Sequence, residues 1–234
     1  MTPARDAPIE DREAEDQRLR AAFARVETWV FDLDKTLYPP REKLFPQIEA
    51  RIGAYVERVL GVSPEEALRL RRAYWENHGA TLAGLMLHHG VDPDPFLEEV
   101  HDIDLSVLTP NPRLAAAIAA LPGTRIVYTN GTAPYARAVT ARLGLSGLFA
   151  RVYGVEAAFY TPKPAAAAYQ RIFGAEGLDP RRAAMFEDDP RNLKVPHEMG
   201  LETVWITPGD DPRPRPDHVD HRAEDLAGFL GRLV

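Results

Sequence analysis

The stretch Val30-Phe31-Asp32-Leu33-Asp34-Lys35-Thr36-Leu37-Tyr38 decides the fold of this chain. Its apolar beginning predicts a buried strand, and two aspartates follow at the strand's end. Because alternate side chains of a strand share one face, Asp32 and Asp34 are expected to converge on one point. Two carboxylates ~4 Å apart repel by roughly 4 kcal/mol at an effective dielectric constant of ~20, so such a pair usually implies a cation, a shared proton or a function. A plain turn after the strand is the alternative, since aspartate is common in turns.

Length and composition restrict the classes of protein. A chain of 234 residues with no cysteine fits one domain, or one domain with an insertion, and it has no disulfides or thiolate metal sites. The formal net charge of −7 is spread along the sequence, which argues against nucleic-acid polymers and anionic membranes as partners. No apolar run is long enough to span a bilayer, and the N-terminus lacks the apolar core of a signal peptide. We therefore expect a soluble cytoplasmic protein, either a monomer or a homodimer.

The region from residue 39 to residue 110 differs from the rest of the chain because its apolar residues recur only at helical spacings. Ser63-Pro64-Glu65-Glu66 has the pattern of a capped helix start, and Gly61 is placed to end the preceding helix. Helices are predicted at 44–60, 64–79, 81–89 and 94–101. This region is predicted to form an all-helical cap domain.

The remaining residues predict an α/β core domain made of 26–38 and 111–234, preceded by a tail and a surface helix within 1–25. After the strand ending at Asp32, strands are expected at 124–130, 151–154, 183–188 and 202–206. Helices are expected at 113–121, 135–143, 164–173, 191–199 and 225–233. This alternation predicts a Rossmann-like, doubly wound parallel sheet with helices on both faces. The roughly ninety residues between the first two strands are too many for one crossover helix, which makes 39–110 an insertion.

Polar side chains collect where these strands end, at the edge where open parallel sheets bind ligands. They are Asp32 and Asp34, Thr129 and Asn130, Glu187 and Asp188, together with Lys163 at the start of a helix. Carboxylate oxygens without neighbouring histidine or cysteine suit Mg²⁺, which commonly binds substrate phosphate as well. Thr129, Lys163 and the backbone N–H groups near Asn130 and Gly131 can then hold phosphate oxygens.

Four elements in order resemble the haloacid dehalogenase (HAD) superfamily of phosphohydrolases, over about residues 26 to 207. They are Asp32-Leu33-Asp34-Lys35-Thr36, Thr129-Asn130-Gly131, Lys163-Pro164, and Glu187-Asp188 followed by Asn192. The sequences around Asp32 and Glu187, with the helical insertion, resemble the pyrimidine 5′-nucleotidase branch. Lys35 departs from that branch, where asparagine is more usual, and adds a positive charge near the cap hinge.

The resemblance implies a Mg²⁺-dependent phosphomonoesterase. Asp32 would attack phosphorus and become an aspartyl phosphate, while Asp34 would act as general acid and then as general base. Side chains of Asp32 and Asp188 and the backbone carbonyl of Asp34 would bind Mg²⁺, with Glu187 beside them. Thr129, Asn130, Gly131 and Lys163 would contact the phosphoryl group, and the cap would exclude water and recognise the rest of the substrate.

Several alternatives remain open. The substrate is expected to be a small phosphorylated metabolite, with a pyrimidine nucleoside monophosphate favoured over phosphoglycolate or a sugar phosphate. A dehalogenase needs neither a second acid nor a metal, so Asp34 and Glu187-Asp188 argue against that class. A phosphosugar mutase shares the site, but its first motif tends to carry Gly-Val where this chain has Lys35-Thr36. Trp75 is interpreted as cap core rather than as a platform for a base.

Overall fold

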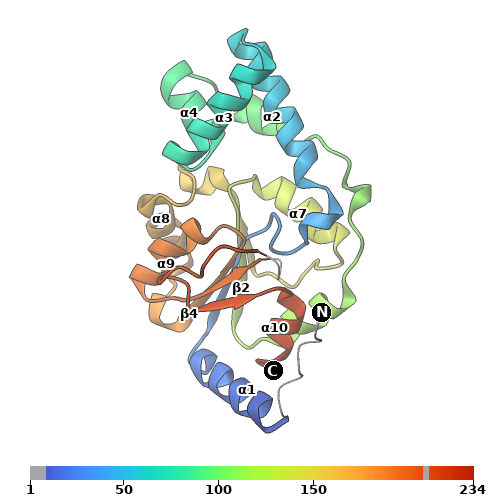
Figure 1. Ribbon diagram of the computed structural model, residues 1–234, viewed down its shortest axis with the longest axis vertical. Coiled ribbons are helices and arrows are strands. Elements are labelled where there is room, and N and C mark those ends of the chain that lie inside the picture. The colour runs from blue at the N-terminus through green and yellow to red at the C-terminus, as the bar shows by residue number, and fades with distance from the viewer. Residues whose placement is uncertain (1–8, 208–210) are drawn as a thin grey trace.

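The computed structural model describes residues 9–207 and 211–234, and a single parallel sheet lies at its centre (Figure 1). The strands are β1 (Thr28–Phe31), β2 (Thr124–Tyr128), β3 (Arg151–Tyr153), β4 (Ala183–Glu187), β5 (Glu202–Ile206) and β6 (His221–Ala223). Their order in the sheet is β3-β2-β1-β4-β5-β6, and all neighbouring pairs are parallel. The predicted doubly wound α/β fold is confirmed.

Helices cover both faces of the sheet because successive strand residues point to opposite sides. Trp29 and Phe31 belong to one apolar cluster, whereas Val30 between them belongs to another. The first cluster is covered by α1 (Ile9–Phe23), α6 (Pro112–Ala120), α7 (Ala133–Arg142) and α10 (Leu226–Gly231). The second is covered by α8 (Ala166–Glu176) and α9 (Lys194–Met199).

The register of β1 explains how distant motifs meet. Phe31 pairs with Val127 of β2 on one side and with Phe186 of β4 on the other. The residues that follow these three strands therefore emerge at the same edge of the sheet. This edge carries Asp32, Thr129 and the Glu187-Asp188 pair.

The insertion consists of α2 (Phe45–Leu60), α3 (Pro64–His78), α4 (Thr81–His89) and α5 (Pro93–His101). Residues 39–110 are all described and contain no strand, as predicted. Ser63 accepts a hydrogen bond from the backbone N–H of Glu66 (3.3 Å), and Gly61 ends α2 with a left-handed φ of 64°. Most buried apolar residues of these helices form a third cluster, which Val155 of the core also joins, whereas Ile48 of α2 belongs to the first cluster of the sheet. Figure 1 shows α2, α3 and α4 above the sheet, while the exact domain boundaries stay a prediction.

Some details differ from the sequence-based expectations. The strand β6 was not predicted, because His221-Arg222-Ala223 is short, polar and only half-buried at the sheet edge. The helix expected at 191–199 divides into a 3₁₀ turn, Pro190–Leu193, and α9. The surface helix expected within 1–25 is α1, which begins at Ile9, and the tail expected before it lies outside the described residues.

Four other 3₁₀ turns connect these elements, at Pro40–Glu42, Leu105–Val107, Val155–Ala158 and Pro180–Arg182. Within the described ranges, no helix is both long and apolar enough to cross a lipid bilayer.

Candidate active site

Asp32 is fixed at the centre of the sheet edge by the strand that precedes it. Its backbone N–H donates to the carbonyl oxygen of Phe186 (2.9 Å), which continues the pairing of β1 with β4. Its side chain is buried, with Oδ1 2.6 Å from Nζ of Lys163 and Oδ2 accepting from the Thr36 hydroxyl at 3.2 Å. Asp32 is therefore a buried carboxylate whose two oxygens are both held by hydrogen bonds.

Lys163 lies between the carboxylates of Asp32 and Glu187. Its ammonium group donates to Asp32 Oδ1 (2.6 Å), to Glu187 Oε1 (2.7 Å) and to the carbonyl oxygen of Tyr128 (3.1 Å), and its side chain is only 1% exposed. Burial alone would lower the pKa of Lys163, but the charges of Asp32 and Glu187 outweigh it and raise the pKa. The lysine therefore stays protonated and carries a permanent positive charge between two carboxylates.

Asn130 holds the main chain of this lysine. Its Oδ1 accepts from the Lys163 N–H (2.8 Å) and its Nδ2 donates to the Lys163 carbonyl (3.1 Å). The Gly131 N–H donates to the Thr129 hydroxyl oxygen at 3.0 Å, which leaves the hydroxyl proton of Thr129 available. The Asn130 side chain therefore positions Lys163, and a phosphate-binding role for residues 129–131 stays a prediction.

Asp34 is held differently from Asp32. Its Oδ1 accepts two hydrogen bonds from hydroxyl groups, one from Tyr38 (2.6 Å) and one from Tyr135 (2.7 Å). Burial, and next the charge of Asp32, raise the pKa of Asp34 to about 6, although the two tyrosines oppose this shift. The sequence analysis gave Tyr38 no role although it ends the stretch that contains Asp34, and Tyr135 could not be found because it lies far along the chain on α7 and has no local motif.

The carboxylates of Asp32, Glu187 and Asp188, here called the acidic cluster, fit a hard divalent cation. Oxygen atoms of Asp32, Glu187 and Asp188 lie within 4.8 Å of one another. Both Glu187 oxygens already accept hydrogen bonds: Oε1 from Lys163 and from Asn192 Nδ2 (2.7 Å), and Oε2 from the Asp189 N–H (2.9 Å). Glu187 is therefore best placed behind the other two carboxylates, where it orients Lys163.

Asp188 forms an ion pair with Lys35, whose ammonium nitrogen lies 3.0 Å from Asp188 Oδ2. Burial raises the pKa of Asp188, and the charge of Lys35 partly offsets this effect. Lys35 has a left-handed φ of 62°, and its Nζ also lies 4.4 Å from the centroid of the Phe45 ring at the start of α2. Lys35, which departs from the sequence motif, therefore links the acidic cluster to α2, the first cap helix.

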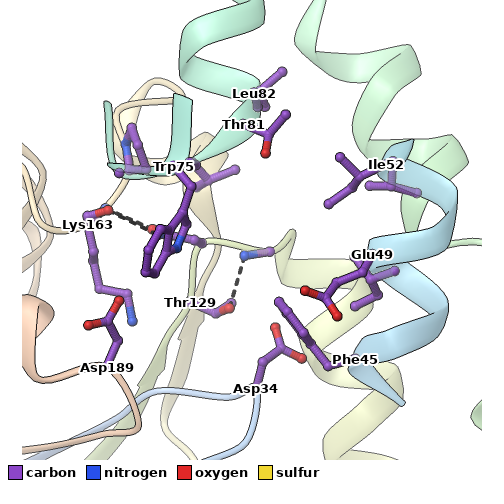
Figure 2. A pocket seen from close by; sticks show the side chains of 18 of the residues that line it. Asp34, Phe45, Glu49, Ile52, Trp75, Thr81, Leu82, Thr129, Lys163 and Asp189 are labelled. Carbon is purple, nitrogen blue, oxygen red and sulfur yellow. Dashed lines mark hydrogen bonds between the residues drawn. The ribbon is translucent and has the colours of Figure 1, made fainter. Parts of the chain in front are cut away.

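A cavity of about 560 Å³ lies between this sheet edge and the cap helices. All the predicted site residues line it: Asp32, Asp34, Thr129, Asn130, Gly131, Lys163, Glu187 and Asp188. Figure 2 shows Glu49 and Ile52 of α2 on one side of the space and Lys163 and Asp189 on the other. The interpretation of Trp75 as cap core is wrong: its side chain is 46% exposed, lines this cavity and lies under the Arg191 guanidinium, 3.4 Å from the ring centroid.

His101, at the end of α5, is a cap residue to which the sequence analysis assigned no role. Its ring stacks on Tyr135 with centroids 4.3 Å apart, and its Nδ1 donates to the carbonyl oxygen of Leu97 (2.8 Å). Burial lowers the pKa of His101 to about 4, so the ring is neutral at pH 7. It connects the cap to the tyrosine that holds Asp34.

Comparisons with known proteins agree with this arrangement. The profile of the haloacid dehalogenase-like hydrolases matches residues 26–221. Similar solved structures include a putative HAD-hydrolase, YfnB from Bacillus subtilis, bound to magnesium (15% identity, TM-score 0.56, covering 89% of this chain and 98% of that one). The L-2-haloacid dehalogenase from Xanthobacter autotrophicus with covalently bound chloropropionic acid has 18% identity and a TM-score of 0.53, covering 88% of this chain and 97% of that one.

The UTR4 protein of Saccharomyces cerevisiae is also similar in fold, with 15% identity and a TM-score of 0.54, covering 86% of this chain and 98% of that one. At these identities the solved structures establish the fold alone, whereas the profile covers most of the chain. With the sheet, the buried lysine and the acidic edge, this match shows that the chain belongs to the haloacid dehalogenase-like hydrolase family.

Proposed function

We propose that this hydrolase is a Mg²⁺-dependent phosphomonoesterase that works through an aspartyl-phosphate intermediate. The observation that carries the proposal is Asp34, a second carboxyl two residues after Asp32, held by two tyrosine hydroxyls with a pKa raised to about 6. Cleavage of a phosphate ester needs an acid for the leaving oxygen and a base for water, and a carboxyl with such a pKa suits both tasks. Displacement of a halide needs no such acid.

The residues would divide the reaction into two steps. In the first, an Asp32 oxygen attacks phosphorus, the bond from phosphorus to the ester oxygen breaks, and Asp34 gives its proton to the departing oxygen. In the second, Asp34 takes a proton from water as the water oxygen attacks phosphorus. The bond from phosphorus to Asp32 then breaks, and inorganic phosphate leaves. Asp34 Oδ1 already accepts two hydrogen bonds, so the transferable proton belongs on Oδ2.

Asp32 and Asp188, with the backbone carbonyl of Asp34, would hold Mg²⁺, and Glu187 would support them from behind. When bound, the cation supplies positive charge against the phosphoryl oxygens and fixes their orientation. Lys163 and Thr129 would face the same oxygens, and Lys163 also holds Asp32 in place through the hydrogen bond to its Oδ1. The cap helices would exclude water from the site.

For the substrate, we propose a pyrimidine nucleoside 5′-monophosphate, on the strength of the sequence motifs around Asp32 and Glu187. A cavity of about 560 Å³ has room for a nucleotide. Phosphoglycolate, a sugar phosphate and a phosphosugar mutase reaction are the alternatives. Dehalogenation of a 2-haloacid is the candidate from another class, favoured by the dehalogenases among the similar structures.

Measuring phosphate release and halide release with the same preparation tests the proposal. UMP, CMP, phosphoglycolate, ribose 5-phosphate and 2-chloropropionate are supplied with Mg²⁺, with EDTA, and with EDTA followed by excess Mg²⁺. We expect phosphate release that EDTA removes and Mg²⁺ restores. Halide release, or full phosphatase activity in EDTA with no tightly held metal, would refute the assignment. A much larger kcat/KM for phosphoglycolate than for any nucleotide would refute only the pyrimidine part.

The roles of the two aspartates are separated by intact-protein mass after acid quench, with p-nitrophenyl phosphate as substrate. Asp32→Asn should form no phosphoryl adduct. Asp34→Asn should lose a factor of roughly 10² to 10⁴ in turnover. It should still accumulate the adduct, because p-nitrophenolate leaves without help from an acid. An adduct on Asp32→Asn would show that the roles are assigned wrongly.

A further inference from the structure

Two arginines of α3, Arg71 and Arg72, line the cavity, and Arg71 is the more buried of the two. Arg71 on α3 lines the cavity, and its Nε is buried without a hydrogen-bond partner among the described residues. Three other cap arginines are paired: Arg51 with Asp102 (3.2 Å), Arg58 with Glu99 (2.6 Å) and Arg69 with Glu66 (2.5 Å). Arg72 is exposed to solvent. Arg71 therefore differs from the three paired arginines in having a buried Nε–H that no described protein group accepts, and from Arg72 in being partly buried.

A buried donor without an acceptor is costly, which favours a ligand that supplies an oxygen acceptor to this guanidinium group. Burial lowers the pKa of Arg71, and the charge of Arg72 adds to this effect while that of Glu49 opposes it. A guanidinium group remains charged at any physiological pH even so. The Arg71 guanidinium is therefore a partly desolvated cation that lines the cavity.

The surroundings of Arg71 show which part of a substrate would reach it. Its Nη1 lies against α2, where a methyl group added to Gly53 would be 3.4 Å away. Glu49, one turn before Gly53, lines the same cavity and points into it in Figure 2. The apolar side chains of Phe45, Ile48 and Ile52 complete this wall. Because the wall belongs to the cap, it would meet the leaving group and not the phosphoryl group.

We propose that Arg71 is a specificity-determining residue that binds an oxygen acceptor, a carbonyl or a carboxylate, at the far end of the leaving group. This inference rests on the proposed phosphatase function. An edge with a carbonyl oxygen beside an N–H group satisfies both Arg71 and Glu49, as the polar edge of a uracil ring would. A carboxylate satisfies Arg71 alone and is repelled by Glu49. The carbonyl edge is therefore the favoured source of the acceptor.

The test compares substrates with and without the acceptor. UMP carries the carbonyl edge, phosphoglycolate carries a carboxylate, and ribose 5-phosphate carries neither. Arg71→Gln should lower kcat/KM for the acceptor-bearing substrate by about 10- to 100-fold, the effect of a hydrogen bond to a charged group. Activity on ribose 5-phosphate should stay within about twofold. Arg71→Lys should fall between wild type and Arg71→Gln, because it keeps the charge and loses the fork.

Arg69→Gln is the matched control, since it removes the same charge from the same helix at a position paired with Glu66 on the surface. It should leave the ratios of kcat/KM among the three substrates unchanged. An equal loss on all three substrates with Arg71→Gln would mean a structural role, and no loss would mean no contact; either result overturns the proposal. A selective loss on phosphoglycolate would support it with carboxylate as the acceptor.

Binding gives the same comparison without turnover. Calorimetry with Asp32→Asn, and with Asp32→Asn combined with Arg71→Gln, measures the affinity for UMP, phosphoglycolate and ribose 5-phosphate. If wild type releases phosphate from none of them, the proposed function fails. A selective loss of affinity would still support the role of Arg71, whereas equal affinities would overturn it.

Discussion

Replacement of Lys163 by methionine should cost much of the stability of the protein as well as its activity. Methionine has a similar length but no charge, so the variant leaves Asp32 Oδ1 and Glu187 Oε1 without the ammonium that lies 2.6 and 2.7 Å from them. Removing one partner of a buried ionic group costs about 3–5 kcal/mol. For a protein of this size, each kcal/mol lowers Tm by roughly 2–4 °C, so we expect a decrease of roughly 6–20 °C.

The double variant Lys163→Met with Glu187→Gln separates the charge effect from a loss of packing. It removes one of the two facing carboxylates, and glutamine keeps an acceptor for Asn192 or for the Asp189 N–H. We therefore expect it to recover about half of the lost stability. Glu187→Gln alone should cost less than Lys163→Met, about 1–3 kcal/mol, because Lys163 keeps Asp32 and the Tyr128 carbonyl.

The assay is urea denaturation followed by circular dichroism, in EDTA so that no cation contributes. Activity should be lost in both variants that lack Lys163, whatever their stability. A cost below about 1 kcal/mol for Lys163→Met would contradict the buried-ion argument. The same conclusion would follow if the double variant were no more stable than Lys163→Met.

Two further predictions concern the contacts between cap and core. Gly79→Ala should lower kcat/KM for every substrate at least about tenfold, because its new Cβ would lie 2.5 Å from the Lys163 carbonyl oxygen. Gly61→Ala is the matched control: it also has a left-handed φ, but its new Cβ would have nothing within 4 Å, so kcat/KM should not fall. Equal losses of kcat/KM in the two variants would exclude the clash as the cause. Wild type should lose stability as the pH falls from 6.5 to 4, by about 2 kcal/mol at pH 5, because the unfolded chain protonates His101 in this range while burial lowers its pKa to about 4 in the folded state. His101→Gln should abolish this loss, whereas the control His88→Gln, at an exposed position, should keep it. Urea denaturation at several pH values measures the effect, and an unchanged pH dependence in His101→Gln would contradict the prediction.

The sheet-edge residues could be predicted from sequence because parallel strands place their ends together. An apolar run followed by polar residues is a local signal, and it was sufficient for Asp32, Thr129 and Glu187. Tyr135 and Arg71 could not be predicted, because each acts through a partner or a space created by distant elements. The β6 strand escaped for a related reason: Val204 pairs with His221, but β6 itself has no apolar pattern.

The backbone of Lys163 gives the site a point at which its integrity could be observed directly. Its amide proton is donated to Asn130, and its carbonyl oxygen faces Gly79 at the junction of α3 and α4. The two peptide groups on either side of the Lys163 Cα thus meet Asn130 and the cap, while the Lys163 side chain reaches Asp32 and Glu187. Separation of the cap would uncover the carbonyl on its Gly79 side and leave the amide bonded to Asn130, whereas movement of Asn130 would break the hydrogen bonds of both groups. Isotope-edited spectroscopy of the Lys163 amide and carbonyl together would therefore distinguish opening of the cap from loosening of the core.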